Sequence, residues 1–406
     1  MGVARQGLCA VATAATSTRL KSEHKLTRQQ LRCTAMYSGR SRMLRLRSQK
    51  NLSMTDPFLA ILCRGGFEAE CAQEGQALAA RDGIATYART ERNLGYVEFP
   101  LPDEASAKTQ EFGHWRHHLF ARSCLHGFAR FNDLPREDRL TPLLGALGDA
   151  TYADVWAESP DTDAGNALTR LRTGLGNALV SALKRERRLD ARAKQRLHLF
   201  IPRENEYWLA TSRLDTGAPW PQGIPRLKFP SEAPSRSTLK LDEAFLTLLD
   251  EGERTRWLQP GMTAVDLGAA PGGWTYQFVR RGMRVNAVDN GPMGTALMDS
   301  GLVTHLREDG FRYKPAKPVD WMVCDMVEQP RRVAERMAQW LAEGWCKRSI
   351  FNLKLPMKKR YAEVQLCFEV MREAMKANGQ DLDLRAKQLY HDREEITVFA
   401  SPTSQR

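Results

Sequence analysis

The sequence predicts an α/β protein, in which a doubly wound, Rossmann-like domain follows an α+β region. Three observations support this fold class. Short apolar segments alternate with helical segments from residue 58 onward. A strand at 264–267 runs into a glycine-rich turn and then a helix at 274–281. Further predicted strands end in acidic residues, which is typical of a parallel sheet that binds a ligand at its carboxyl edge.

The composition is that of an ordinary globular protein. The chain has 406 residues, of which 42% are hydrophobic and 27% charged, enough for two or three domains with their own cores. No apolar run approaches the roughly 20 residues of a membrane span, so we expect no membrane association. The 8 cysteines include no C-x-x-C pair, which excludes a zinc ribbon or dithiol motif and favours a reducing, cytoplasmic compartment.

The net charge of +12 is concentrated in residues 1–53, which we call the basic leader. This segment holds eleven basic residues and one acidic residue, which leaves a net charge of +2 for residues 54–406. The global charge therefore says little about the partner of the folded body. Three interpretations of the leader stay open: a disordered tail or upstream-start extension before Met54, which we favour, a transit peptide, or a basic RNA-binding arm.

From Met54 onward the pattern predicts a small α+β subdomain at 54–150. It comprises strands at 58–63, 95–99 and 119–131 and helices at 67–80 and 140–146.

A second subdomain with its linker is expected at 151–230. Strands are predicted at 152–156, 198–201 and 207–211, with an amphipathic helix at 167–187 and a Pro-rich linker at 219–234. The helix end and the following residues are densely basic: Lys184, Arg185, Arg187, Arg188, Arg192, Lys194 and Arg196. This basic run is either a solvated face or a surface that contacts phosphates.

The glycine-rich turn at 268–273 is the strongest signal for a cofactor. The dinucleotide fingerprint is absent because position 270 is Ala, and the P-loop sequence is absent because Trp274 follows Gly273, so both kinds of phosphate site are disfavoured. The next predicted strand ends at Asp289, 21 residues after Gly268, near the spacing of an acid that binds ribose hydroxyls. Asp309 and Asp325 follow the third and fourth strands, and the series predicts S-adenosylmethionine binding at 231–406.

The residues after the glycine-rich turn limit which class of group can accept the methyl. The fourth strand lacks the [ND]-P-P-aromatic sequence typical of amino-group methylation, and Cys324 is expected in the core rather than as a nucleophile. Lys354 instead ends an apolar fifth strand beside the cofactor edge, where its ammonium must be desolvated or find a carboxylate. A lysine with a lowered pKa suits general-base activation of a ribose 2′-hydroxyl.

These residues carry a resemblance to a known family. Lys240, Asp325, Lys354 and an acid in 394–395 resemble the K-D-K-E tetrad of FtsJ-type 2′-O-ribose RNA methyltransferases. Across residues 56–400 the sequence is most similar to the bacterial 23S ribosomal RNA cytidine 2′-O-methyltransferases. Of the two acids we choose Glu395 over Glu394, because it directly precedes a β-branched strand.

The resemblance implies a class I methyltransferase domain preceded by a THUMP-like RNA-binding region. It implies that Lys354 accepts the proton and that no metal takes part. The residues implied to hold the cofactor are Ser237, Ala270, Pro271, Gly272, Gly273, Asp289, Asp309 and Asp325. We expect a monomer whose partner is 23S ribosomal RNA. A small-molecule O-methyltransferase and a non-catalytic rRNA-binding assembly factor are the alternatives.

Overall fold

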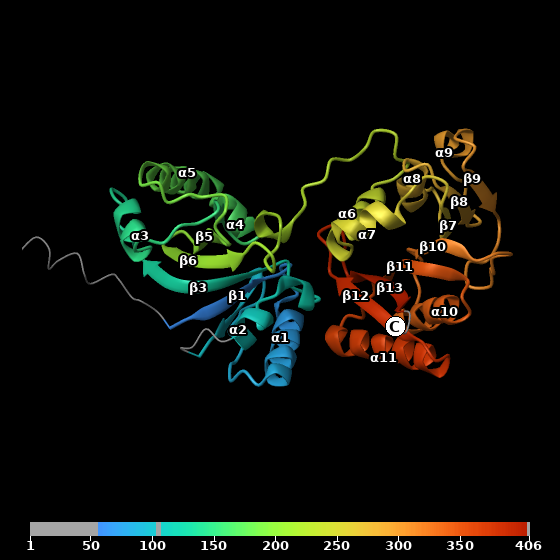
Figure 1. The fold of residues 1–406 in the computed structure, drawn as a ribbon, viewed down its shortest axis with the longest axis horizontal. Helices are drawn as coiled ribbons and strands as arrows, with labels where there is room; N and C mark the ends of the chain where they lie inside the picture. Colours follow the sequence, from blue (N-terminus) through green and yellow to red (C-terminus); the bar gives the residue numbers. More distant parts are fainter. Residues whose placement is uncertain (1–55, 103–106, 404–406) are drawn as a thin grey trace, which may run out of the picture. The chain divides into compact units, whose positions relative to one another are not determined.

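The computed structural model describes residues 56–102 and 107–403, and the basic leader lies outside them. Two sheets organise the described chain (Figure 1). The fold is α/β, as predicted, with a Rossmann-like sheet in the C-terminal part. Within the described ranges, no helix has the length and apolar character needed to cross a membrane.

The N-terminal sheet has six strands in the order β2-β1-β3-β6-β5-β4. Their bounds are β1 (Phe58–Leu62), β2 (Tyr96–Pro100), β3 (Ser123–Asn132), β4 (Val155–Glu158), β5 (Gln195–Arg203) and β6 (Glu206–Arg213). All neighbours pair antiparallel except β4 and β5. Because β3 pairs with β6, one continuous sheet crosses the boundary that the sequence placed at residue 150.

Short helices accompany this sheet. They are α1 (Glu68–Asp82), α2 (Ala107–Phe112), α3 (Leu140–Ala146), α4 (Asp163–Ala167) and α5 (Thr169–Arg185), with 3-10 turns η2 (Trp115–His117) and η3 (Pro221–Gly223). The helix expected at 167–187 is α5, which begins two residues later and ends two residues earlier. The short α4 precedes it, and the backbone leaves helical geometry at Leu168 between them. Leu179 and Leu183 of α5 are fully buried against the sheet, as its apolar period predicts.

The C-terminal sheet has seven strands in the order β12-β13-β11-β10-β7-β8-β9. Their bounds are β7 (Thr263–Leu267), β8 (Arg284–Val288), β9 (Val303–Leu306), β10 (Val319–Cys324), β11 (Cys346–Lys354), β12 (Asp381–Lys387) and β13 (Glu395–Thr403). The five strands from β11 to β9 run parallel, and β13 runs antiparallel beside β11. The carboxyl ends of the parallel strands therefore meet at one edge.

Helices cover this sheet and complete its core. They are α6 (Thr238–Leu248), α7 (Glu251–Trp257), α8 (Gly273–Val279), α9 (Thr295–Asp299), α10 (Pro330–Ala342) and α11 (Arg360–Ala377). Trp321 and Trp340 are fully buried, as is Cys324, which agrees with its expected place in the core.

A buried lysine joins the two sheets. Lys387, at the end of β12, donates hydrogen bonds to three backbone carbonyls of the segment before β3, those of Trp115, His118 (2.5 Å) and Ala121 (2.8 Å). The Glu74 carboxylate accepts the backbone N–H groups of Leu119 at 2.5 Å and Phe120 at 2.9 Å. We call Lys387, Glu74 and this segment (115–121) the lysine clamp; it ties the N-terminal sheet to the C-terminal one.

Candidate active site

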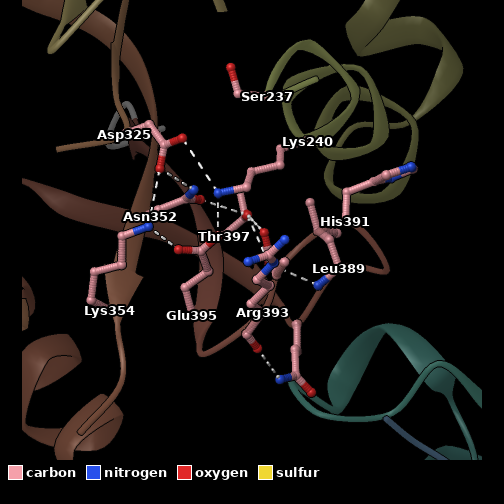
Figure 2. A network of polar contacts seen from close by, with 12 residues as sticks. Ser237, Lys240, Asp325, Asn352, Lys354, Leu389, His391, Arg393, Glu395 and Thr397 are labelled. Carbon is pink, nitrogen blue, oxygen red and sulfur yellow. Dashed lines mark hydrogen bonds and ion pairs between the residues drawn. The ribbon is translucent and has the colours of Figure 1, made fainter. Parts of the chain in front are cut away.

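Four charged side chains converge at the carboxyl edge of the C-terminal sheet (Figure 2). The register of β11 and β13 places Lys354 directly opposite Glu395. Lys240 reaches the same point from the first turn of α6, and Asp325 follows the last residue of β10. The structure thus brings together all four residues expected in the tetrad.

The tetrad forms a closed ring of ion pairs. Lys240 and Lys354 both donate to Glu395, one to each carboxylate oxygen. Their Nζ atoms each lie 3.4 Å from a different oxygen of Asp325. Two lysines therefore share two carboxylates. The buried end of the fifth strand predicted a carboxylate partner for Lys354, and the structure provides two, Asp325 and Glu395.

Burial and charge oppose each other within this ring. Burial would lower the pKa of Lys240, but the Asp325 charge and the hydrogen bond with Glu395 outweigh it and raise that pKa. Burial would likewise raise the pKa of Glu395, but the hydrogen bonds and charges of both lysines lower it. The Lys354 side chain is 25% exposed and the Glu395 side chain only 5%, so of these two it is Lys354 that solvent reaches more easily.

The two adjacent glutamates lie in different surroundings. The Glu394 side chain is 64% exposed and pairs with Arg360. Successive residues of a strand point to opposite faces, so only one of them can face the lysines. The structure places Glu395 there, and Glu394 outside the ring.

The glycine turn lies next to the tetrad. A Cβ on Gly268 would lie 2.5 Å from Cγ of Met326, the residue after Asp325. A Cβ on Gly273 would lie 2.1 Å from Oγ of Ser237, whose carbonyl accepts the N–H of Lys240. Only glycine permits these close approaches, and the φ of Gly272 is +112°. The turn, with Ala270 and Pro271 at its centre, and the tetrad are parts of one edge.

Asp289 supports the turn from the end of β8. One of its carboxylate oxygens accepts the N–H of Ala270 at 3.0 Å, and the other accepts the N–H of Gly291 at 2.7 Å. Each oxygen keeps a further lone pair that a ribose hydroxyl could use. These acceptor oxygens therefore fit the ribose hydroxyls of a nucleoside.

Asp309 lies at the same edge of the sheet but makes fewer contacts with the glycine turn than Asp289 does. Its side chain is 54% exposed, accepts the N–H of Phe311 at 2.9 Å and lies 3.6 Å from Arg312. The following residue, Gly310, packs beside Met326 and Leu267, so the segment lies at the same edge.

Three polar residues behind the tetrad were missed from the sequence: Asn352, Thr397 and Asp392. The register pairs Asn352 with Thr397, two positions from Lys354 and Glu395 on the same face. That spacing of two was the signal available in the sequence. Asp392 is buried and contacts Thr397, but a position before the strand gave no such signal.

The basic run after α5 splits into two groups. Arg188 donates to the carbonyls of Leu147 and Ala150, Arg192 pairs with Asp190, and Arg196 pairs with Asp154. Lys184, Arg185, Arg187 and Lys194 remain exposed, as does Arg192, whose side chain is 90% exposed despite its ion pair. The surface available to phosphates is therefore smaller than the sequence run indicated.

Known proteins share both halves of this architecture. The family model of the FtsJ-like methyltransferases matches residues 233–403, and that of the RlmM ferredoxin-like domain matches residues 57–125. The ribosomal RNA large subunit methyltransferase M of Xanthomonas oryzae pv. oryzae is 53% identical over 348 residues, covering 84% of this chain and 98% of the relative. That of Stenotrophomonas maltophilia is 52% identical, covering 85% and 97%. The chain belongs to the ribosomal RNA large subunit methyltransferase M family.

Membership in this methyltransferase M family confirms the predicted family and makes the protein an enzyme that transfers methyl groups. The N-terminal match is to a ferredoxin-like domain and lies within the predicted subdomain at 54–150. A THUMP-like character of residues 151–230 stays a prediction.

Proposed function

We propose that this methyltransferase transfers the methyl group of S-adenosylmethionine to the ribose 2′-hydroxyl of a cytidine in 23S ribosomal RNA. The ring in which Lys240 and Lys354 share Asp325 and Glu395 is the observation that carries this proposal. The names of the relatives support ribosomal RNA as the substrate class. The 2′-position follows from the resemblance of the tetrad, and the cytidine follows from the wider similarity of residues 56–400 to the cytidine 2′-O-methyltransferases.

The glycine turn, Ser237, Asp289, Asp309 and Asp325 would hold the cofactor. When bound, S-adenosylmethionine supplies an electrophilic methyl group on a sulfonium. The turn brings backbone N–H groups to this edge, and the free lone pairs of Asp289 suit the ribose hydroxyls of the nucleoside.

Lys354 accepts the proton in this proposal. Its amine form takes the proton of the 2′-hydroxyl as that oxygen becomes the nucleophile. Glu395 and Asp325 then stabilise the ammonium that results, because both carboxylates already lie against its nitrogen. Lys240 stays charged and compensates the carboxylates while Lys354 is neutral, which agrees with its raised pKa.

The N-terminal sheet would contribute RNA binding. The exposed Lys184, Arg185, Arg187 and Lys194 are able to neutralise phosphates. Arg188 and Arg196, whose side chains are only 12% and 11% exposed, serve the fold of this region instead.

Replacing Lys354 tests the proposal. Lys354→Ala should lower the rate of methyl transfer to 23S rRNA by roughly 10²–10⁴-fold, the usual contribution of a general base. Affinity for S-adenosylmethionine should stay unchanged, as measured by calorimetric titration. Lys358→Ala is the matched control, because it removes an exposed lysine from the same segment.

The product identifies the acceptor atom. A 2′-O-methyl group protects the adjacent phosphodiester from alkali, so labelled rRNA should yield an alkali-resistant dinucleotide containing cytidine. Methyl transfer in RNA-free extract would favour the small-molecule alternative. Cofactor binding with no transfer to any RNA would favour the assembly factor, and a Lys354→Ala rate near wild type would remove the proton-acceptor role.

A further inference from the structure

A chain of buried polar groups leads from the loop before β13 to the tetrad. The Asn352 amide nitrogen donates to Oδ1 of Asp325 at 2.7 Å. The Thr397 hydroxyl lies 2.8 Å from Oδ1 of Asn352 and 3.1 Å from both carboxyl oxygens of Asp392. Asn352, Thr397 and Asp392 are buried, and Figure 2 shows Asn352 and Thr397 behind the ring of ion pairs.

Counting donors fixes the direction of this chain. Because the Asn352 nitrogen serves Asp325, its oxygen must accept a hydrogen, and the Thr397 hydroxyl is the donor within reach. A hydroxyl has a single hydrogen, so towards Asp392 the Thr397 oxygen can only accept. Asp392 must then supply a proton, which an ionised carboxylate lacks. Turning the Asn352 amide over would set its oxygen against the Asp325 carboxylate.

The surroundings of Asp392 favour the protonated form. The N–H of Leu389 donates to its Oδ2 at 2.9 Å, which leaves Oδ1 to carry the proton. Burial, and then the charge of Glu395, raises the pKa of Asp392 well above its usual range; Glu243 adds to the rise, and Lys240 opposes it.

We propose that Asp392, in its protonated form, Thr397 and Asn352 form a one-directional hydrogen-bond relay that positions the Asp325 carboxylate between Lys240 and Lys354. The three are positioning residues, because none lies in the ring itself. The relay deepens the proposed function: it fixes Oδ1 of Asp325, the oxygen that faces Lys354, and leaves Oδ2 to Lys240.

The loop that carries Asp392 is held from two sides. Glu243 of α6 accepts the N–H groups of Tyr390 and His391, at 2.8 and 3.0 Å. Arg64, which follows β1 in the N-terminal sheet, donates to the carbonyl of Asp392 at 2.7 Å. The origin of the relay is therefore fixed by both halves of the chain.

Substitutions separate this relay from a general structural role. Thr397→Val keeps the shape but removes the hydroxyl, so kcat should fall roughly 10- to 100-fold, the range for leaving buried polar groups without their partner. Because Asp325 is also proposed to hold the cofactor, the KM for S-adenosylmethionine should rise as kcat falls. Thr397→Ser restores a hydroxyl and should recover most of the rate.

Asp392 supplies the sharper contrast. Asp392→Ala should lower kcat about as far as Thr397→Val. Asp392→Asn should rescue it to within a few-fold of wild type, because the amide can donate to Thr397 and accept from Leu389. A kcat of Thr397→Val within twofold of wild type, or an Asp392→Asn rate as low as that of Asp392→Ala, overturns the relay.

An infrared measurement makes the test independent of activity. The difference spectrum between wild type and Asp392→Asn at pH 7 should contain the carbonyl band of a protonated carboxylic acid. Absence of this band overturns the relay even if rRNA is methylated. Conversely, wild-type protein that shows the band but fails to methylate rRNA refutes the proposed function and leaves the relay standing.

Discussion

In the described part of the chain, two groups of lysines and carboxylates lie at least partly buried, and they differ in what surrounds each ammonium. In the lysine clamp, Lys387 is 3% exposed and its three hydrogen bonds all go to backbone carbonyls. In the tetrad, Lys240 and Lys354 contact carboxylates, and their side chains are 15% and 25% exposed. The lysine of the clamp is thus enclosed by backbone groups, whereas the lysines of the tetrad are partly exposed to solvent.

The electrostatics follow the same division. Burial lowers the pKa of Lys387 and raises the pKa of Glu74. For both groups, the cost of removing the charge from water therefore exceeds the stabilisation of that charge by its neighbours. In the tetrad the carboxylates outweigh burial and raise the pKa of Lys240. We infer that the lysine clamp serves to hydrogen-bond backbone carbonyls between the two sheets. The tetrad instead keeps charged side chains at a position that solvent reaches.

The largest expected effect is the loss of the clamp. Lys387→Met removes the lysine donor from three buried carbonyls, of which that of Trp115 keeps the longer hydrogen bond from the His118 N–H at 3.4 Å. Each carbonyl left without a donor costs about 1–3 kcal/mol, and the relieved burial of the ammonium offsets part of this. We expect the free energy of unfolding to fall by about 3 kcal/mol, measured by urea denaturation.

Lys240→Met is the comparison variant in the tetrad. It should abolish most methyl transfer yet lower the free energy of unfolding by less than Lys387→Met does, because Lys354 still pairs with both carboxylates. Equal losses of stability in the two variants would contradict the division between clamp and tetrad.

His118 makes the clamp region sensitive to acid. Its Nε2 donates to the carbonyl of Phe112 at 2.6 Å, and burial lowers the pKa of its imidazole to about 3. The unfolded chain binds this proton below about pH 6.5, whereas the folded chain does not, so the free energy of unfolding falls as the pH drops below 6.5. The loss at pH 5 amounts to about 2 kcal/mol.

His118→Gln keeps a donor for Phe112 and removes the titration. Its thermal stability should therefore decline less between pH 7 and pH 5 than that of the wild type. His117→Gln, at the exposed neighbouring position, should retain the wild-type decline. Parallel declines in wild type and His118→Gln would show that His118 is not the group that titrates.

The sequence was most informative where chemistry is local. The strand, glycine turn and helix at 264–281 lie within one short segment, and each tetrad residue adjoins a motif or a strand end. The choice of Glu395 over Glu394 rested on the β-branched strand that follows, and strand alternation explains why only one of the two faces the lysines.

Contacts between residues far apart in the chain could not be predicted from the sequence. Lys387 ends a strand that the sequence did not predict, and its acceptors lie more than 260 residues earlier in the chain. For the same reason the pairing of β3 with β6 was missed and a boundary was placed at 150. Such contacts depend on which surfaces meet, and no local spacing records that.

The smallest expected effect concerns the charge shared by the two tetrad lysines. Glu395→Gln keeps the shape but removes the carboxylate that both lysines contact. The maximal rate of methyl transfer should fall roughly tenfold, because the ammonium formed on Lys354 loses a charged partner. The pKa of Lys240 should also fall, because one of the groups that raise it is gone. The alkaline decline of the pH–rate profile therefore begins at lower pH.

Glu394→Gln is the matched control for this change. Its side chain is exposed and pairs with Arg360, so the rate and the alkaline limb should match those of the wild type. If Glu394→Gln moved the alkaline limb as far as Glu395→Gln, the effect would be one of general surface charge. The tetrad would then differ from the clamp in exposure alone, and a charge shared between two lysines would no longer explain its chemistry.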